Sequence, residues 1–443
     1  MMEDWRWMTA ADLGRGIAAG QIDPVELTEV YLTAIETHPE SSRIYARVTP
    51  NRARSEAAAA SNRAKMGQRL SPLDGVPISW KDLIDSKDVA TEAGTALMKG
   101  RTPTEDAEVL KLATAAGLVC LGKTHLSEIA FSGLGVNPIT ATSPNVHDPD
   151  AAPGGSSSGA AASVAFGLAA AGIGSDTGGS VRIPSAWNDL TGLKTTVGRL
   201  STKNVVPLCE SFDSIGPLCR SVEDTAFLMS IMEGAGAVDL RGTTLTGTNL
   251  AVLNTIGMDG LQDSPKAAFE AAVDKLTAAG ATIHRIDMPE MLDAFAVAGP
   301  LYTADSWSWW RDRIEKDPTK MFSQIYDRIK VGAEVTAADY LNGWRKLHDV
   351  RAIYRAQTAQ YDAVILPSCP IMPPNVAKLL EDSAYYLQSN LLALRNTRVA
   401  NLMDVPSMSL PTGIPSSGIM FNGQTGKEEK LLRLATAAER ALA

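Results

Sequence analysis

Two clusters of glycine and serine lie close together near the middle of the chain. The first reads Pro-Gly-Gly-Ser-Ser-Ser-Gly over residues 153–159, and the second reads Gly-Ser-Asp-Thr-Gly-Gly-Ser-Val-Arg-Ile-Pro over residues 174–184. Glycines beside a serine let backbone N–H groups and a hydroxyl approach a ligand without an intervening Cβ atom. The small-residue segment between the clusters predicts a helix over 159–171 followed by a short buried strand. Both clusters would then be held at a fixed separation.

Three kinds of site are compatible with these clusters. A phosphate-binding loop is disfavoured, because neither cluster fits G-x-x-x-x-G-K-[ST] or G-x-G-x-x-G. A structural role, with glycines in turns and the serines at 156–158 as helix N-caps, is what isolated clusters of this kind most often have. In the third kind, a serine attacks a carbonyl carbon and neighbouring N–H groups stabilise the oxyanion that forms.

The second cluster favours acyl transfer, because the small residues before Ser180 can direct several successive N–H groups at one point beside that serine. A serine nucleophile needs a base. None of the five histidines lies in a comparable glycine-rich or strand-end context, so a Ser-His-Asp triad is not suggested. Lys81, which follows the apolar run 78–80, is the alternative base, as in Ser-Lys arrangements. Taken alone, a lysine at a strand end more often extends its amine toward solvent.

Helical patterns alternate with short apolar runs along the chain, which indicates βαβ units and a substantially parallel sheet. We expect three helices between residues 9 and 66, and further helices over 105–116, 222–232 and 264–279 and from 427. Strands are predicted at 78–80, 118–121, 282–286, 363–366, 407–410 and 418–421. Because runs near both ends of the chain read as strands of one sheet, we expect a single domain over residues 1–443.

The segment 299–351 is rich in aromatic residues. These are Tyr302, Trp307, Trp309, Trp310, Phe322, Tyr326, Tyr340 and Trp344. Aromatic side chains at helical spacing usually pack in a core, and we expect most of them to do so. Some are expected to wall a substrate pocket, so we assign this helical segment to the substrate side and residues 60–225 to the catalytic core.

Composition excludes several classes of function. A net charge of −9 without a basic stripe argues against a nucleic-acid partner. No C-x-x-C, H-x-x-x-H or H-E-x-x-H pattern is present, so we expect no metal centre and reduced thiols at Cys120, Cys209, Cys219 and Cys369. The first eight residues lack the apolar region of a secretory signal, and no segment reads as a membrane span. We therefore expect a cytoplasmic protein with no membrane partner.

The chain resembles the amidase signature family of serine hydrolases over most of its length. The residues that carry the resemblance lie at 75–82, 122–124, 153–159, 174–184 and 213–220, with weaker matches at 366–367 and 406–423. The resemblance implies an α/β fold, a single large α/β/α domain whose mixed central sheet is covered by helices. It also implies a hydrolase that needs no cofactor and cleaves a carbonyl C–N bond through an acyl-enzyme.

Carried over residue by residue, the resemblance implies that Ser180 is the nucleophile, Lys81 the base and Ser156, in a cis peptide, the serine between them. The N–H groups of the oxyanion hole would belong to Thr177, Gly178, Gly179 and Ser180. The loop would be supported by Asp176, Arg182 and Ser157. To act as a base, Lys81 needs a pKa lowered from about 10.4 to about 7–8. Burial without a carboxylate partner achieves this, so we expect Asp82 to point away and bond the backbone.

Three positions depart from the family's usual pattern. Ser158 stands where glycine is usual, His125 stands where asparagine is usual, and Trp80 is bulkier than is typical before the lysine, so we expect it to narrow the site. The family acts on amides, anilides, carbamates (urethanes) and allophanate. The aromatic segment favours a small aryl or apolar acyl substrate, including aryl carbamates. We expect the protein to be a monomer or a homodimer. The alternatives are the catalytic A-type subunit of a glutamine-dependent tRNA amidotransferase, an allophanate-type amidohydrolase, or a non-catalytic binding protein.

Overall fold

One mixed sheet of eleven strands runs through the computed structural model, which describes residues 3–443. Met1 and Met2, which begin the segment considered for a secretory signal, lie outside the described residues. The strand order is β1-β3-β2-β4-β6-β5-β10-β11-β9-β7-β8. The strands are β1 (Tyr45–Val48), β2 (Pro77–Lys81), β3 (Val119–Thr124), β4 (Ala171–Asp176), β5 (Thr191–Lys194), β6 (Ser214–Cys219), β7 (Asn249–Leu253), β8 (Thr282–Ile286), β9 (Ala363–Pro367), β10 (Ser407–Pro411) and β11 (Gly418–Asn422).

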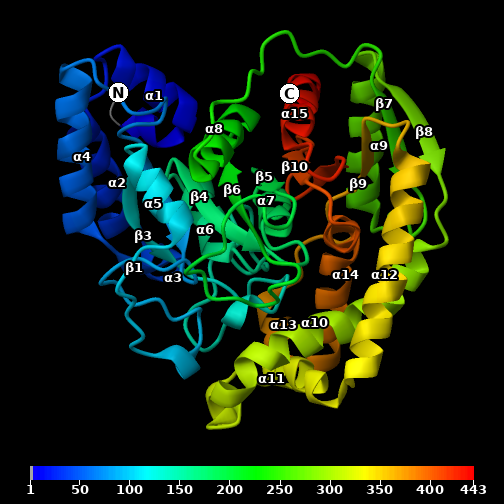
Figure 1. Ribbon diagram of the computed structural model, residues 1–443. Helices are drawn as coiled ribbons and strands as arrows, with labels where there is room; N and C mark the ends of the chain where they lie inside the picture. The colour runs from blue at the N-terminus through cyan, green and yellow to red at the C-terminus, as the bar shows by residue number, and fades with distance from the viewer. Residues whose placement is uncertain (1–2) are drawn as a thin grey trace.

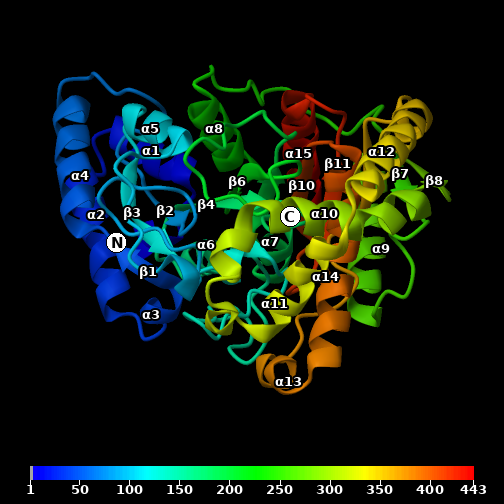
Figure 2. The ribbon, with the colours of Figure 1, turned by 60° about the horizontal axis from the view of Figure 1, so that its bottom comes forward.

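Helices cover both faces of this sheet. The α-helices are α1 (Ala10–Ala18), α2 (Pro24–Thr37), α3 (Ser41–Ile44), α4 (Pro50–Lys65), α5 (Glu108–Ala115), α6 (Ser158–Ala165), α7 (Arg182–Trp187), α8 (Val222–Glu233), α9 (Asp263–Ala278), α10 (Met291–Ile314), α11 (Ser323–Ile329), α12 (Ala337–Thr358), α13 (Val376–Glu381), α14 (Ser383–Met403) and α15 (Glu428–Leu442). Short 3₁₀ helices are η1 (Glu3–Trp7), η2 (Ala96–Met98), η3 (Glu128–Ala130), η4 (Pro318–Lys320) and η5 (Lys330–Glu334). In Figure 2 the strands cross the middle of the molecule, with α5, α8 and α15 on one side and α6, α7 and α14 on the other.

Strand direction changes across the sheet. Four neighbouring pairs are parallel and six are antiparallel, so the expectation of a substantially parallel sheet is wrong for its centre. The reason is visible at β10 and β11, which a short loop, residues 412–417, joins without a crossover helix. β2 pairs in parallel with both β3 and β4. The carboxyl ends of these three strands therefore lie at one edge, as parallel pairing requires.

Most predicted elements are present near their predicted bounds. Thr9 caps α1, Asp23 caps α2 ahead of its first residue, Pro24, and α4 ends just before Gly67, whose φ of 68° suits a glycine. The strands predicted near the carboxyl end are β9, β10 and β11, and they join the sheet that contains β2 and β3. The chain therefore folds as one large α/β domain. The strands β1, β5, β6 and β7 were not predicted.

The helix predicted over 159–171 is too long. The observed helix α6 ends at Ala165, and β4 begins only at Ala171. Gly167 explains the early end, because its φ of 66° places it in the left-handed region, where a helix commonly stops. The residues that follow cross to the sheet as a buried connection, since positions 168–171 are fully buried.

Helices α10 to α14 form a separate helical layer beside the sheet. Figure 1 places α10, α11 and α13 at the bottom of the view, and Figure 2 shows them coming forward together with α14. This layer contains the aromatic segment, and most of its rings pack in or against the core, including the fully buried Trp310. Among the helices of residues 3–443, none is long and apolar enough for a bilayer-crossing span. All four cysteines are buried and unpaired.

Candidate active site

Four chain segments converge at the edge where β2 and β4 end. Lys81 is the last residue of β2, and Ser175 and Asp176 are the last two residues of β4. Ser156 precedes α6, and Ser180 precedes α7. Because β2 and β4 are parallel neighbours, their final side chains meet without any further loop to position them.

The side chain of Lys81 is fully buried, so the expectation for an isolated strand-end lysine, that its amine reaches solvent, does not hold here. Its Nζ donates to Ser156 Oγ at 2.7 Å and to Ser175 Oγ at 2.9 Å. Burial lowers the pKa of Lys81 to about 7, although the charges of Asp176 and Asp213 act in the opposite direction. The amine is therefore held by two hydroxyl groups in a place that favours its neutral form.

Asp82, the next residue along the chain, turns away from this amine. Its carboxylate accepts a hydrogen bond from Arg47 Nη1 at 3.0 Å and another from the Glu92 backbone N–H at 3.2 Å. It also lies 3.4 Å from Lys123 Nζ. As expected from strand alternation, the carboxylate nearest in sequence is occupied elsewhere and does not stabilise the charged form of Lys81.

The first serine cluster is tied to the second through Ser157. The Gly155–Ser156 peptide bond is cis. The Ser157 N–H donates to Ser180 O at 3.1 Å, and Ser157 Oγ donates to Ser175 O at 3.2 Å. Within residues 3–443 no hydrogen bond joins Ser156 to Ser180, and catalytic hydrogen bonds are often long before substrate binds. The clusters are nevertheless adjacent.

Neither Ser157 nor Ser158 caps a helix. Ser157 occupies the N-cap position of α6 without a side-chain capping bond, and Ser158 Oγ is buried without a hydrogen-bond partner in the described chain. The structural alternative that explained this cluster by N-capping is therefore wrong. Trp80 is buried in the core and does not line the cavities at Ser180, so the expectation that it narrows the site is also wrong.

Ser180 ends a tight loop in which glycine is required at position 179. Gly179 has a φ of 135°, and a Cβ atom there would come within 2.0 Å of Thr397 Oγ1. The Gly179 N–H donates to Asp176 Oδ1 at 2.9 Å, so it is not available to a ligand. In the described chain, no hydrogen-bond acceptor is paired with the N–H groups of Thr177, Gly178 and Ser180. Three of the four expected oxyanion donors are thus free.

A buried ion pair holds this loop. Arg182 Nε lies 3.0 Å from Asp176 Oδ2, and Arg182 Nη2 lies 2.9 Å from Asp176 Oδ1. Burial acts to raise the pKa of Asp176, but the charge and hydrogen bonds of Arg182, with a bond from Asn401, outweigh it and hold the pKa well below its usual range. Arg182 also donates to Thr397 O at 2.8 Å and to Asn401 Oδ1 at 2.6 Å. The pair therefore joins the loop to α14.

Asp213 and Arg220, the first and last residues of the segment 213–220, bond to backbone and loop groups. Asp213 accepts hydrogen bonds from the Thr177 hydroxyl and from two N–H groups, at Leu208 and Cys209. Burial raises the pKa of Asp213 to about 6 despite these bonds. Arg220 donates to backbone carbonyls, including Ala170 O at 3.1 Å and Val164 O at 2.7 Å.

Ser180 opens into a cavity of about 30 Å³, called here the inner cavity. It is lined by Ala130, Phe131, Ser132, Thr177, Gly178, Ser180, Leu208, Tyr302, Arg328, Leu394 and Arg398. Ser180 is 3% exposed, and its Oγ bonds to no group in the described chain. The nucleophile candidate therefore faces this space.

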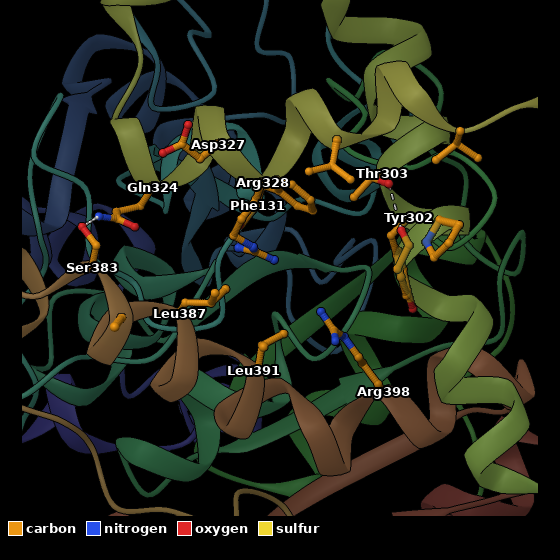
Figure 3. Close-up of a pocket in the computed structure, with 15 residues that line it drawn as sticks. Phe131, Tyr302, Thr303, Gln324, Asp327, Arg328, Ser383, Leu387, Leu391 and Arg398 are labelled. Atoms are coloured by element: carbon orange, nitrogen blue, oxygen red, sulfur yellow. Dashed lines mark hydrogen bonds between the residues drawn. The ribbon is translucent and has the colours of Figure 1, made fainter.

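A larger space of about 650 Å³, the outer pocket, adjoins the inner cavity. The two share Phe131, Tyr302, Arg328 and Arg398 (Figure 3). The remaining walls come mostly from apolar residues of the helical layer, namely Pro300, Val331, Val335, Ala384, Leu387 and Leu391. Of the eight aromatic residues singled out in 299–351, only Tyr302 lines either space, and its hydroxyl donates to Thr177 O at 3.0 Å.

Several residues of the site were not predicted. Ser175, the second hydroxyl on Lys81, lies inside the second glycine-serine cluster and could have been found from its place beside Asp176 at the strand end. Arg328 and Arg398 have no local sequence signal, because α11 and α14 reach the site only through tertiary packing. No group of three or more His, Cys, Asp or Glu side chains within residues 3–443 is arranged to hold a metal ion.

Comparison with known proteins gives consistent matches over the full length. A family model described as Amidase matches residues 26–432. The 2-amino-5-chloromuconic acid deaminase of Comamonas testosteroni is 32% identical, over 98% of this chain and 96% of that protein. The A-type subunit of the glutamyl-tRNA(Gln) amidotransferase of Chloroflexus aggregans is 29% identical, over 99% of this chain and 97% of that protein. A crystal structure of an amidase, 27% identical, matches with a TM-score of 0.89 over 98% of this chain and 100% of that chain.

Removing Arg182 should destabilise the protein strongly, because Asp176 would remain as an unpaired buried charge. We expect Arg182→Met to lower the free energy of unfolding by about 3–5 kcal/mol in urea denaturation followed by circular dichroism. The exposed pair between Arg241 and Asp239 provides the control, since Arg241→Met should leave the unfolding curve unchanged. Equal curves for both variants would contradict a supporting role for the buried pair.

Proposed function

The chain belongs to the amidase family, and we propose that it hydrolyses a carbonyl C–N bond with Ser180 as nucleophile, Ser156 as proton relay and Lys81 as base. The observation that carries the proposal is the contact between Lys81 and Ser156. A fully buried amine, 2.7 Å from a serine hydroxyl and without a carboxylate partner, has the properties of a general base near neutral pH. The other buried lysines bind acceptors of a different kind: Lys123 pairs with the carboxylate of Asp82, and Lys194 donates to the backbone carbonyls of Thr195 and Val405.

The first half of the reaction forms an acyl-enzyme. Ser180 Oγ attacks the carbonyl carbon and gives its proton to Ser156 Oγ, whose own proton passes to Lys81 Nζ. Lys81 becomes an ammonium group, and the carbonyl oxygen becomes an oxyanion. When the tetrahedral intermediate collapses, the C–N bond breaks and the leaving nitrogen receives the proton from Lys81 through Ser156.

The second half regenerates the enzyme. A water molecule attacks the ester carbonyl on Ser180 Oγ, and its proton follows the same path to Lys81. Collapse of the second intermediate returns that proton to Ser180 and releases the carboxylic acid. For a carbamate the released acid is a carbonic acid derivative, and the catalytic steps are otherwise the same.

The proposed oxyanion hole uses the N–H groups of Thr177, Gly178 and Ser180. We omit Gly179 from the four donors that the family resemblance implies, because its N–H is bonded to Asp176. Each such donor typically contributes about 3–4 kcal/mol to lowering the barrier. The Tyr302 hydroxyl bound to Thr177 O helps to orient the peptide group that carries the Gly178 N–H. The Thr397 hydroxyl, bound to Gly178 O at 2.7 Å, holds the next peptide group, whose Gly179 N–H is bonded to Asp176.

The substrate must be argued from the pocket, because relatives of similar identity carry different activities in their names, a deaminase and an amidotransferase subunit. An outer pocket of about 650 Å³ with mostly apolar walls is suited to a small ligand. We propose amides, anilides and carbamates with a small aryl or apolar part, aryl carbamates included. Tyr302 and Phe131 are the aromatic side chains positioned to contact that part.

A second candidate is the catalytic subunit of a glutamine-dependent tRNA amidotransferase. It is favoured by the match to such a subunit over 99% of this chain. A subunit of that kind would require partner chains and glutamine, whereas a free-standing amidase acts alone. The two candidates therefore differ in what the purified chain does by itself.

The purified chain should hydrolyse model amides, anilides or carbamates without added proteins or glutamine. Product release should be followed by absorbance over a panel of compounds, with Ser180→Ala as the blank, which is expected to lose roughly 10⁴-fold or more in kcat. A fluorophosphonate should label Ser180 in the wild type only. Activity that appears only with partner subunits and glutamine would favour the second candidate, and an unlabelled, inactive chain would favour a binding protein.

Loss of the Ser156 hydroxyl should lower kcat, whereas loss of a neighbouring serine hydroxyl outside the proposed relay should not. Ser156→Ala should lower kcat by about 10²–10⁴-fold, because Lys81 then has no hydroxyl through which to reach Ser180. Ser158→Ala is the matched control, since its hydroxyl is buried in the same cluster without a partner and its loss should leave kcat unchanged. Similar losses in both variants would contradict the relay.

The neutral form of Lys81 predicts the direction of the pH dependence. Below about pH 7 the lysine is protonated, so kcat/KM should rise about tenfold per pH unit and level off above pH 7. Lys81→Ala should remove most turnover. Burial also raises the pKa of Glu128 to about 7, so Glu128→Gln serves as the control. If the acid limb disappeared in Glu128→Gln, the assignment to Lys81 would be wrong.

A further inference from the structure

We propose that Arg328 and Arg398 form a binding site for a carboxylate, so that the substrate is an acidic amide whose carboxylate lies between Ser180 and the outer pocket. This inference rests on the proposed function and adds to it a substrate class. It is based on where the two guanidinium groups lie, on what they contact and on which partners they lack.

The two arginines come from different helices and meet at the same place. Arg328 belongs to α11 and Arg398 to α14, and both line the inner cavity with Ser180 as well as the outer pocket. Figure 3 shows the two guanidinium groups directed into the same space from opposite walls. Both arginines therefore belong to the wall that the outer pocket and the inner cavity share.

Neither arginine is paired with an acid in residues 3–443. Arg328 Nη1 donates to Phe131 O at 2.6 Å, and its guanidinium lies over the Phe131 ring, 4.4 Å from the centroid. Arg398 lies over the Tyr302 ring, 5.6 Å from the centroid, and its Nε is buried without a partner. By contrast, the fully buried Arg182 is paired with the carboxylate of Asp176.

The pocket therefore concentrates positive charge in a protein whose net charge is negative. Burial lowers the pKa of Arg328 to about 10, and the neighbouring charge of Arg398 acts in the same direction. Burial also lowers the pKa of Arg398. Asp327, the acid that lines the outer pocket, is exposed and already pairs with Lys330 at 2.6 Å. A bound anion would relieve this repulsion.

A carboxylate fits the chemistry of these groups better than a neutral amide does. A guanidinium presents parallel N–H donors that match the two oxygens of a carboxylate, and the charge-assisted bonds are about twice as strong as neutral ones. The inner cavity is small, so the carboxylate would lie within a few bonds of the scissile carbonyl. The apolar walls of the outer pocket then receive the remainder of the molecule.

The test compares a matched pair of substrates, glutaric acid mono-4-nitroanilide and its methyl ester. The wild type should hydrolyse the acid with a kcat/KM roughly 10- to 100-fold above that of the ester. Arg398→Gln and Arg328→Gln should each lower kcat/KM for the acid by about that factor and change the ester by less than about threefold. Arg395→Gln, one turn earlier on α14 and outside both spaces, should change neither.

Binding without turnover provides the second measurement. Glutarate should bind to the Ser180→Ala protein in titration calorimetry, and Arg398→Gln introduced into that background should weaken binding by at least about tenfold. The Arg398→Lys change should restore part of it, because charge returns without the paired donors. Retained folding is checked by circular dichroism.

The inference is overturned if acid and ester are hydrolysed equally by the wild type, or if the arginine variants affect both compounds alike. Failure of the proposed function has a different signature. In that case neither compound is hydrolysed and Ser180 is not labelled, while arginine-dependent glutarate binding would still support the carboxylate site. Absence of glutarate binding to the Ser180→Ala protein with both arginines intact would count against the site itself.

Discussion

The buried ion pair between Asp176 and Arg182 is the interaction on which the site depends. It connects the end of β4 to the start of α7 across a loop that contains the nucleophile candidate. Asp176 receives two backbone N–H groups of that loop, and Arg182 reaches α14 and the hydroxyl of Ser407 on β10. Two full charges are buried together only when their remaining hydrogen-bonding groups are satisfied. Here the other bonds of Asp176 hold the loop, and the other bonds of Arg182 hold α14 and β10.

The same pairing explains how burial can lower the pKa of Lys81 although acids lie close to it. The charge of Asp176 is balanced by Arg182, and that of Asp82 is balanced by Arg47 and Lys123. Each of these two carboxylates thus has a cation of its own, which leaves burial as the dominant effect on the lysine. The hydroxyls of Ser156 and Ser175 bind the amine without favouring its charge.

Local features of the chain were predictable, and tertiary ones were not. Caps at Thr9 and Asp23 and the turn glycine at 67 mark helix ends by chemistry within a few residues. The residues around Ser156 and Ser180 were found because they belong to contiguous motifs. Strand direction at the centre of the sheet and the walls of the pocket depend on packing between segments far apart, which no short pattern records. Arg398 lies 218 positions beyond Ser180 and is identified only by the fold.

A short stretch of α14 links the two halves of the site. Thr397 and Asn401 are four positions apart, share a face, and bind the nucleophile loop through Gly178, Arg182 and Asp176. Leu394 and Arg398, also four apart, occupy the neighbouring face and line the inner cavity. A helix is stiff over this length, so the backbone position of Arg398 relative to the proposed oxyanion donors is set by α14 rather than by a mobile loop. A substrate held by its carboxylate would therefore present its carbonyl at a fixed distance from Ser180, and acids of different chain length should be distinguished by that distance.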